Sequence, residues 1–142
     1  IELAGDINSR MPEYVVERIN RALNERKKSL RGAKILILGV AYKKDIKDLR
    51  ESPALDVIKL LQNAGAKVKY HDPLVPSIRM DDSDWKPVKL TQSILRSSDC
   101  VAILADHSSY DYDSIVRNAR LVMDTRNATK SVKVNREKIV KL

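Results

Sequence analysis

The residues with the clearest chemical potential follow directly after a short apolar run. Residues 35–38 are all apolar, and Gly39 comes next. The following twelve residues carry seven charged side chains before Ser52 and Pro53, which are typical of the start of a helix. A buried strand that leads through a charged loop into a helix can hold an anion, because the first helical turn presents unpaired N–H groups.

Three bases in this loop could bind phosphate oxygens. Lys43 and Lys44 offer mobile ammonium groups, and Arg50 offers a planar guanidinium that matches two oxygens at once. The alternative is a solvated loop in which Asp45 and Asp48 neutralise the neighbouring bases. The composition of the loop alone does not separate these two interpretations.

The glycine fingerprint of a dinucleotide-binding turn is missing from the same loop. That fingerprint is G-x-G-x-x-G after the first strand, where the glycines let the backbone approach a pyrophosphate. Here only Gly39 is present, and Ala41 and Lys44 stand at the other two glycine positions. We therefore expect a Rossmann-like strand and helix that do not bind NAD by themselves.

No catalytic group of residues is evident elsewhere in the chain. His107 stands between Asp106 and Ser108, but neighbours on one loop rarely adopt the geometry of a catalytic triad. His71 ends a predicted strand, which favours a structural role. Cys100 begins an apolar run and is interpreted as a small core residue. Two histidines and one cysteine, dispersed in the sequence, do not form a zinc motif.

Alternating strands and helices predict an α/β fold with a Rossmann-like, doubly wound, mostly parallel sheet, preceded by a long connecting helix. The apolar periodicity predicts strands at 34–40, 67–71, 100–105 and 120–124, an optional edge strand at 138–142, and helices at 12–30, 53–63 and 112–118. A further short helix is predicted to begin at Thr91 or Ser93 and to end near 97–98. Residues 1–10 are predicted to be a lead-in, and 74–87 a polar connector. We divide the chain into a connecting helix (1–32) and a C-terminal domain (33–142).

In a parallel sheet the carboxyl ends of the strands meet at one edge, where ligands bind. This topology would bring the loops at 42–44, 72–73, 106–108 and 124–126 together. Arg126 lies in the last of them, directly after the strand that ends at Asp124. Arg126 could contribute to an anion site, or it could form only a surface salt bridge with Asp124, which would stabilise little.

Composition limits the possible partners. The chain has 142 residues with 27 Lys and Arg against 19 Asp and Glu, a net charge of +8. This charge permits nucleic acid, an acidic membrane surface or a phosphorylated small molecule as partner. Five Tyr, one Trp and no Phe provide no stacking platform for single-stranded nucleic acid. No apolar run approaches the roughly 20 residues that span a bilayer.

The ends and the single cysteine suggest the origin of the chain. It begins Ile1-Glu2-Leu3 without a Met or a signal peptide, so we expect a fragment of a longer protein. One cysteine excludes a disulfide framework and fits a reducing cytoplasm.

The run GVAYKKDIKDLRESPALDVIKLL closely resembles the start of the C-terminal domain of the UDP-glucose/GDP-mannose dehydrogenase family. The family pattern is matched by Gly39, Ala41, Tyr42, Lys43, Asp48, Arg50, Glu51, Ser52 and Pro53. The blocks INSRMPEYVVERI, KYHDPLVP, ILADHSSYDYDSI and LVMDTRNA are similar to further parts of the same region. The resemblance therefore covers nearly the whole chain.

The resemblance implies a function and a set of binding residues. Family members oxidise C6 of a nucleotide sugar to a carboxylate in two NAD-dependent steps. An N-terminal domain binds NAD, a central helical domain carries the catalytic Cys and Lys, and the C-terminal domain covers the nucleotide. By this resemblance Tyr42 and Lys43 contact the UDP-sugar, Arg126 holds the nucleotide, and Arg50 reaches the NAD pyrophosphate. Cys100 does not match the nucleophile, so the chain should bind substrate without catalysing the reaction.

Within the family, the sequences of these blocks are most similar to UDP-N-acetylglucosamine and UDP-N-acetylmannosamine 6-dehydrogenases, with UDP-glucose 6-dehydrogenase as the alternative. The implied partners are a UDP-sugar, the N-terminal and central domains of the same polypeptide, and further copies in a homo-oligomer. The implied setting is polysaccharide biosynthesis in the cytoplasm, without nucleic acid or membrane. Two other classes stay open: a basic nucleic-acid-binding module, and an oligomerisation element built on the helix at 12–30.

Overall fold

A central parallel sheet organises the protein. The computed structural model describes residues 2–41, 44–45, 49 and 52–142, and only the backbone of residues 2–9. In these ranges the sheet has the order β2-β1-β5-β6-β7 and is parallel throughout. Its strands are β1 (Lys34–Leu38), β2 (Lys67–His71), β5 (Cys100–Ile103), β6 (Val122–Asp124) and β7 (Ile139–Lys141). The helices are α1 (Glu2–Glu25), α2 (Pro53–Asn63), α3 (Gln92–Ser97) and α4 (Tyr112–Asn118), with a 3₁₀ turn at Arg136–Lys138.

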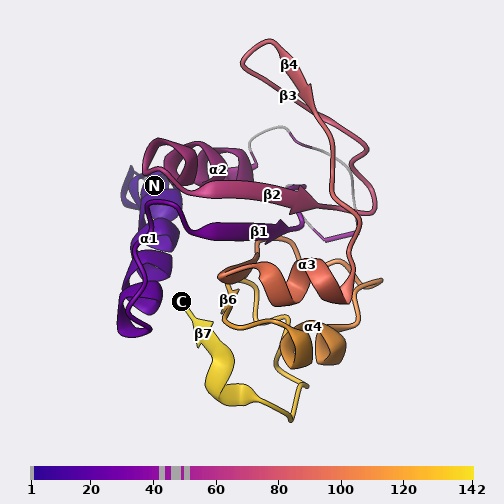
Figure 1. The fold of residues 1–142 in the computed structure, drawn as a ribbon. Helices are drawn as coiled ribbons and strands as arrows, with labels where there is room; N and C mark the ends of the chain where they lie inside the picture. The colour runs from indigo at the N-terminus through magenta and orange to yellow at the C-terminus, as the bar shows by residue number, and fades with distance from the viewer. Residues whose placement is uncertain (1, 42–43, 46–48, 50–51) are drawn as a thin grey trace.

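Helices cover both faces of the sheet (Figure 1). Alternate residues of β1 point to opposite faces, as the pleat requires. Ile35 and Ile37 join one core with α1 and α2, whereas Leu36 and Leu38 join a second core with α3 and α4. All four side chains are at most 1% exposed. This two-sided burial confirms the predicted doubly wound fold, and explains why the strand is apolar without alternation.

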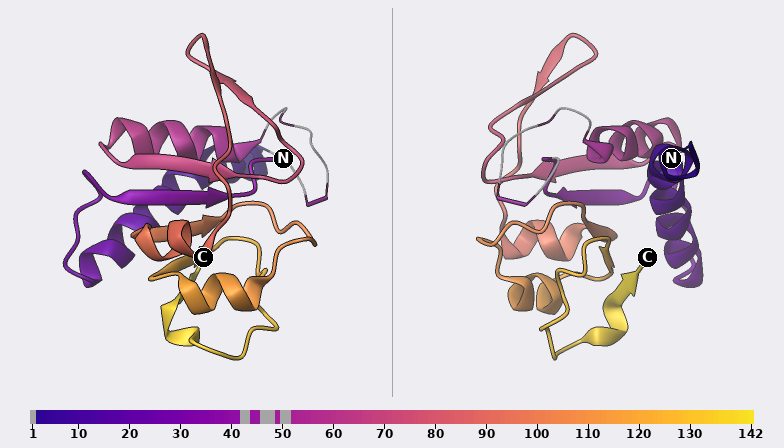
Figure 2. Two further views of the ribbon diagram at one scale, coloured as in Figure 1. Left: turned by 45° about the vertical axis from the view of Figure 1, so that its right-hand side comes forward. Right: turned by 180° about the vertical axis from the view of Figure 1, so that it is seen from behind.

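The strand order reverses beside β1 (Figure 2). The chain passes from β1 through α2 to β2, then returns across β1 to β5 on its other side. The loops that follow β1 and β5 therefore diverge from neighbouring strand ends. In open α/β sheets this switch point is where ligands bind.

Side-chain caps begin three of the helices in the described ranges. Ser52 caps α2, Thr91 caps α3, and Asp111 caps α4, each accepting a hydrogen bond from a backbone N–H of the first turn. The predicted bounds of α2 and α4 are confirmed, as is the predicted edge strand near the C-terminus, which pairs with β6.

The first helix differs from its prediction at both ends. It spans Glu2–Glu25, so residues 2–10 are helical rather than a lead-in, and Pro12 lies inside it. Gly32 does not end the helix. Instead, Lys27 adopts a left-handed conformation with φ of 62°, and the Lys28 N–H donates to Leu23. This is a Schellman ending made without glycine, and so it left no signal in the sequence.

The polar connector contains a hairpin that the sequence analysis missed. Strands β3 (Ile78–Met80) and β4 (Ser83–Trp85) pair antiparallel and project from the body of the protein (Figure 1). Asp81 and Asp82 form its tight turn with φ of 49° and 64°. A two-residue turn with both residues left-handed usually contains glycine or asparagine. Two consecutive aspartates indicate such a turn less clearly than glycine or asparagine would, so the hairpin was not predicted.

None of the helices in the described ranges is both long and apolar enough to cross a bilayer.

Gly39 and Gly32 form a matched pair for testing the turn after β1. Both have φ near +80°, but a Cβ on Gly39 would lie 2.5 Å from the Ala105 carbonyl oxygen, whereas one on Gly32 meets nothing within 4 Å. We predict that Gly32→Ala costs about 1 kcal/mol of unfolding free energy for left-handed strain alone. Gly39→Ala should cost about 2–4 kcal/mol, because overpacking against backbone is added. Urea denaturation would measure both, and equal losses would contradict the close approach.

Candidate functional site

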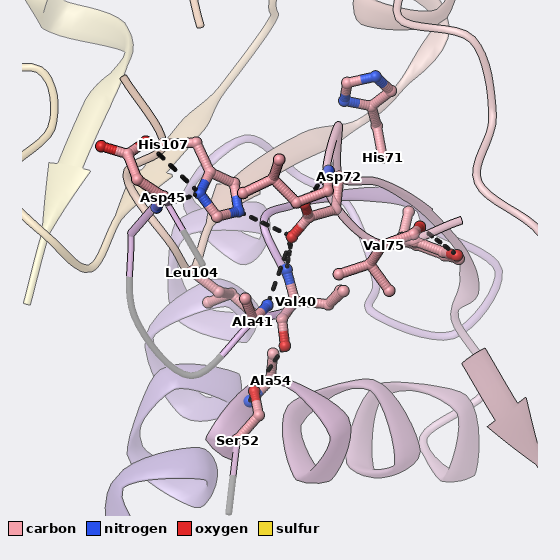
Figure 3. Close-up of polar contacts among 12 residues, drawn as sticks. Val40, Ala41, Asp45, Ser52, Ala54, His71, Asp72, Val75, Leu104 and His107 are labelled. Atoms are coloured by element: carbon pink, nitrogen blue, oxygen red, sulfur yellow. Dashed lines mark hydrogen bonds and ion pairs between the residues drawn. The ribbon is translucent and has the colours of Figure 1, made fainter. Parts of the chain in front are cut away.

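A buried carboxylate joins the carboxyl ends of three neighbouring strands (Figure 3). Asp72 follows β2 and is 3% exposed. Its Oδ2 accepts hydrogen bonds from the Val40 and Ala41 N–H groups at 2.8 and 3.4 Å, and its Oδ1 accepts one from Leu74 at 2.9 Å. Its fourth partner is His107, 2.9 Å away, on the loop after β5. Four donors compensate the cost of burying this acidic group.

Both ring nitrogens of His107 are engaged, and their partners define the tautomer. Nδ1 accepts a hydrogen bond from the Asp45 N–H at 2.7 Å, so the ring hydrogen lies on Nε2. Nε2 then donates to Asp72. The imidazole, 1% exposed, therefore connects the interior carboxylate with the loop after β1.

The carboxylate of Asp45 is held from the same loop as His107. Oδ1 accepts from the Ser108 N–H at 2.8 Å, and Oδ2 accepts from the Ser108 hydroxyl at 2.6 Å. Hydrogen bonds from Ser108 hold the pKa of Asp45 below its ordinary value. Asp45 itself is left-handed, with φ of 60°. Its carboxylate is hydrogen-bonded to Ser108, and the charge of the adjacent Lys44 makes a smaller contribution to lowering its pKa.

The N-terminus of α2 uses its own cap. The hydroxyl of Ser52 donates to the Val40 carbonyl at 2.6 Å and accepts from the Ala54 N–H at 3.3 Å. Pro53 has no N–H. The expectation that this helix start presents unpaired N–H groups to an anion is therefore weakened.

The turn after β1 does not fit the pyrophosphate of a dinucleotide. In the dinucleotide grip, backbone N–H groups of this turn face the phosphates. Here the Val40 and Ala41 N–H groups face the internal carboxylate of Asp72. The single glycine, Gly39, serves a close contact with Ala105. These contacts agree with the missing fingerprint.

A second buried carboxylate shapes the turn that carries Arg126. Asp124, 1% exposed, accepts hydrogen bonds from the N–H groups of Arg126, Ala128 and Thr129 and from the Thr129 hydroxyl. Burial alone would raise the pKa of Asp124, but hydrogen bonds from Thr129, Ala128 and Arg126 bring it below its ordinary value. Asp124 thus organises the turn from inside rather than acting as a surface acid.

The side chain of Arg126 lies against the end of the neighbouring strand. Its Nε donates to the Leu104 carbonyl at 3.0 Å, while the residue as a whole is exposed. The Thr125 hydroxyl donates to Ile103, which fixes the same turn on β5. Arg126 therefore stands beside the loop that contains His107, at the carboxyl edge.

Two tyrosines, Tyr110 and Tyr112, pack at the carboxyl edge of the sheet and hydrogen-bond to backbone carbonyls there. The Tyr110 hydroxyl donates to the His71 carbonyl at 2.9 Å and lies 3.0 Å from His71 Nδ1. The Tyr112 hydroxyl donates to the His107 carbonyl at 2.8 Å. Burial raises the pKa of both tyrosines well above the ordinary value and lowers that of His71. These groups stay neutral near pH 7 and brace the site.

The predicted site residues fall into two groups. Tyr42, Lys43 and Arg50 lie outside the described residues. Arg126 is described and lies at the predicted edge. Cys100 is fully buried at the opposite end of β5, and burial raises its pKa to about 12, which confirms its interpretation as a core residue.

Sequence reasoning missed the connecting residues of the edge. His107 was considered only with its neighbours, Asp106 and Ser108, whereas its partners are Asp72 and Asp45, 35 and 62 residues away. The available signal was positional. The loops at 72–73 and 106–108 were predicted to meet at this edge, and the contact between Asp72 and His107 confirms that prediction. Which side chains bond to one another there was not predicted.

Comparison with known proteins shows the family of this chain. A sequence model described as the UDP-glucose/GDP-mannose dehydrogenase family, UDP binding domain, matches residues 36–131. The chain belongs to this family. The UDP-N-acetyl-D-mannosamine dehydrogenase of Methanococcus maripaludis is 33% identical over 135 residues, which cover 89% of this chain and 30% of that protein.

Two solved structures of similar proteins superpose on nearly the whole chain. The UDP-D-ManNAc dehydrogenase of Pyrococcus horikoshii is 26% identical with a TM-score of 0.77, covering 98% of this chain and 32% of that one. The NDP-N-acetyl-D-galactosaminuronic acid dehydrogenase of Methanosarcina mazei is 26% identical with a TM-score of 0.80, covering 99% and 30%. The chain thus spans about a third of the length of these family members.

Replacing Asp124 tests the construction of the Arg126 turn. Because the folded pKa lies below 3.8, the charged side chain contributes stability that is full above about pH 4 and is lost as pH falls through the folded pKa. Asp124→Asn should lose about 2 kcal/mol or more at pH 7, and its difference from the unmodified chain should shrink below pH 4.

Urea denaturation across pH 3–7 would measure this difference. Asp82→Asn is the control, because that exposed left-handed position accepts asparagine and should change stability by less than about 0.5 kcal/mol. A loss for Asp124→Asn that is independent of pH would contradict the assignment.

Proposed function

We propose that this chain is the UDP-sugar-binding domain of an NAD-dependent nucleotide-sugar 6-dehydrogenase, and that it binds the nucleotide without catalysing oxidation. The observation that carries the proposal is the position of Arg126 beside the switch point, in a chain whose family is described by UDP binding. Tyr42 and Lys43 are proposed to contact the UDP-sugar from the loop after β1. Arg50 is proposed to face the pyrophosphate of NAD held by another domain.

The chemistry of the edge supports binding by side chains. The backbone N–H groups after β1 already bind Asp72, and the first turn of α2 is capped by Ser52. A diphosphate at this edge would therefore depend on guanidinium and ammonium groups, which form strong charge-assisted bonds with phosphate oxygens. Arg126 can contribute such a group from the β6 end.

Variants of Arg126 test the nucleotide site. We predict that Arg126→Ala weakens UDP binding by roughly 10- to 100-fold, the equivalent of a charge-assisted hydrogen bond of about 1.5–3 kcal/mol. Arg126→Lys should retain part of the affinity, because the charge remains without the planar fork. Heteronuclear NMR titration of the 142-residue chain with UDP would give both affinities and the residues that shift.

Arg31→Ala is the matched control, since it removes the same charge from an exposed position before the amino end of β1. It should leave UDP affinity within about twofold, a difference of roughly 0.4 kcal/mol. Equal weakening by Arg31→Ala and Arg126→Ala would reduce the effect to net charge and reject Arg126 as a contact.

The sugar and the remaining partners belong to the same proposal. The names of the relatives favour a UDP-N-acetylhexosamine over UDP-glucose, which stays the alternative. The reaction requires an NAD-binding domain and catalytic residues that the described turn after β1 does not supply. These would come from N-terminal and central domains of one polypeptide, in a cytoplasmic homo-oligomer. The division at residue 32 stays a prediction.

A nucleic-acid-binding module is the alternative from another class. One observation favours it: an open depression of about 600 Å³ at the amino edge of the sheet is lined by five bases, Arg26, Lys28, Arg96, Arg120 and Lys138. However, Asp99 pairs with two of these bases, and Lys138 donates to carbonyls at the end of α4. This alternative predicts steeply salt-dependent binding to DNA or RNA. Absence of a gel shift at low salt would remove it.

A further inference from the structure

The loop after β1 is held at three described points. At its start, the Val40 and Ala41 N–H groups bind Asp72. At its end, the Ser52 hydroxyl binds the Val40 carbonyl. Between them, the Asp45 N–H donates to His107 (Figure 3). The Asp45 carboxylate accepts hydrogen bonds from Ser108.

We propose that His107 is a positioning residue for nucleotide binding, which acts by fixing Asp45 and therefore the bases beside it. The proposal rests on the proposed function. Lys44 adjoins Asp45 in the chain, so fixing the backbone of Asp45 also restricts where the backbone of Lys44 can lie. Fixing one backbone position in this loop reduces the conformational freedom that nucleotide binding must remove.

The geometry favours this role over simple core packing. Any buried imidazole needs partners for both ring nitrogens, so the role of His107 depends on which segments supply them. Here Nε2 binds the interior carboxylate of Asp72, and Nδ1 binds the loop at Asp45. Since Asp72 also binds the start of the loop, a single chain of hydrogen bonds connects Ala41, Asp72, His107 and Asp45. These bonds fix the position of the loop relative to the ends of β2 and β5.

Ser108 supports the same arrangement from outside. It donates to both carboxylate oxygens of Asp45, at 2.8 and 2.6 Å. These bonds direct the carboxylate toward the β5 loop, so it competes less with a phosphate for hydrogen bonds from the lysines. His107 and its neighbour thus fix the backbone and the side chain of one residue.

Two substitutions of His107 separate the two bonds. In His107→Asn the amide oxygen takes the place of Nδ1 and can accept from Asp45, but nothing reaches Asp72. In His107→Gln the amide nitrogen takes the place of Nε2 and can donate to Asp72, but the acceptor for Asp45 is lost. Ser108→Ala removes one bond to the Asp45 carboxylate at an exposed position, where the fold is not at risk.

The experiment measures three quantities on the 142-residue chain and each variant: hydrogen exchange of the Asp45 amide, UDP affinity by NMR titration, and the urea midpoint. We expect His107→Gln to accelerate Asp45 exchange at least tenfold and to weaken UDP binding three- to tenfold. His107→Asn should keep the Asp45 amide protected and UDP affinity within twofold. Its urea midpoint should nevertheless fall further than that of His107→Gln, because the buried Asp72 loses a hydrogen-bond donor. Ser108→Ala should weaken UDP binding two- to threefold without lowering the midpoint.

Several results would overturn the inference. Equal UDP affinity in His107→Gln and His107→Asn would do so, as would affinities that follow the urea midpoint instead of Asp45 exchange. Unchanged Asp45 exchange in His107→Gln would show that the ring does not hold the loop. If the unmodified chain does not bind UDP, the proposed function fails, whereas the exchange measurement still reports separately on the bond between His107 and Asp45.

Discussion

The arrangement of the carboxyl edge depends on the burial of one charged group, the carboxylate of Asp72. An isolated carboxylate in a protein interior costs several kcal/mol unless donors surround it. Three backbone N–H groups and the ring of His107 meet this requirement, and they come from the ends of β1, β2 and β5. The hydrogen bonds to Asp72 therefore fix the backbone directly after β1 and β2 and the loop after β5.

This internal acid changes how the fold can bind a nucleotide. The N–H groups that face a pyrophosphate in the dinucleotide grip are occupied here by a carboxylate of the protein itself. Asp124 plays the same part at the end of β6, where its carboxylate accepts hydrogen bonds from three N–H groups of the turn. The guanidinium of Arg126 lies at the edge of the sheet. In both places an acid inside organises a loop that carries bases outside. Under the proposed function, side chains rather than backbone N–H groups would bind the nucleotide.

Much of the fold could be predicted from local signals, but the polar connections could not. Apolar residues placed β1 and α4, and the Ser52 cap with Pro53 placed the start of α2, because strand burial, apolar periodicity and N-capping depend on residues close in sequence. The end of α1 and the hairpin β3–β4 were missed, since Lys27, Asp81 and Asp82 adopt left-handed conformations usually marked by glycine or asparagine. The pairing of His107 with Asp72 and Asp45 depends on strand order, which spacing along the chain does not reveal. The family motif supplied Arg126, whose position agrees with the predicted edge.

A crystal structure of the 142-residue chain with UDP would test the central claim most directly. The account predicts the diphosphate at the carboxyl edge, in contact with Arg126 and with bases of the loop after β1, while Asp72 keeps its bonds to Val40, Ala41 and His107. Density for the diphosphate in the depression between Arg96 and Arg120 at the amino edge would contradict it. So would a diphosphate bound by the Val40 and Ala41 N–H groups in place of Asp72.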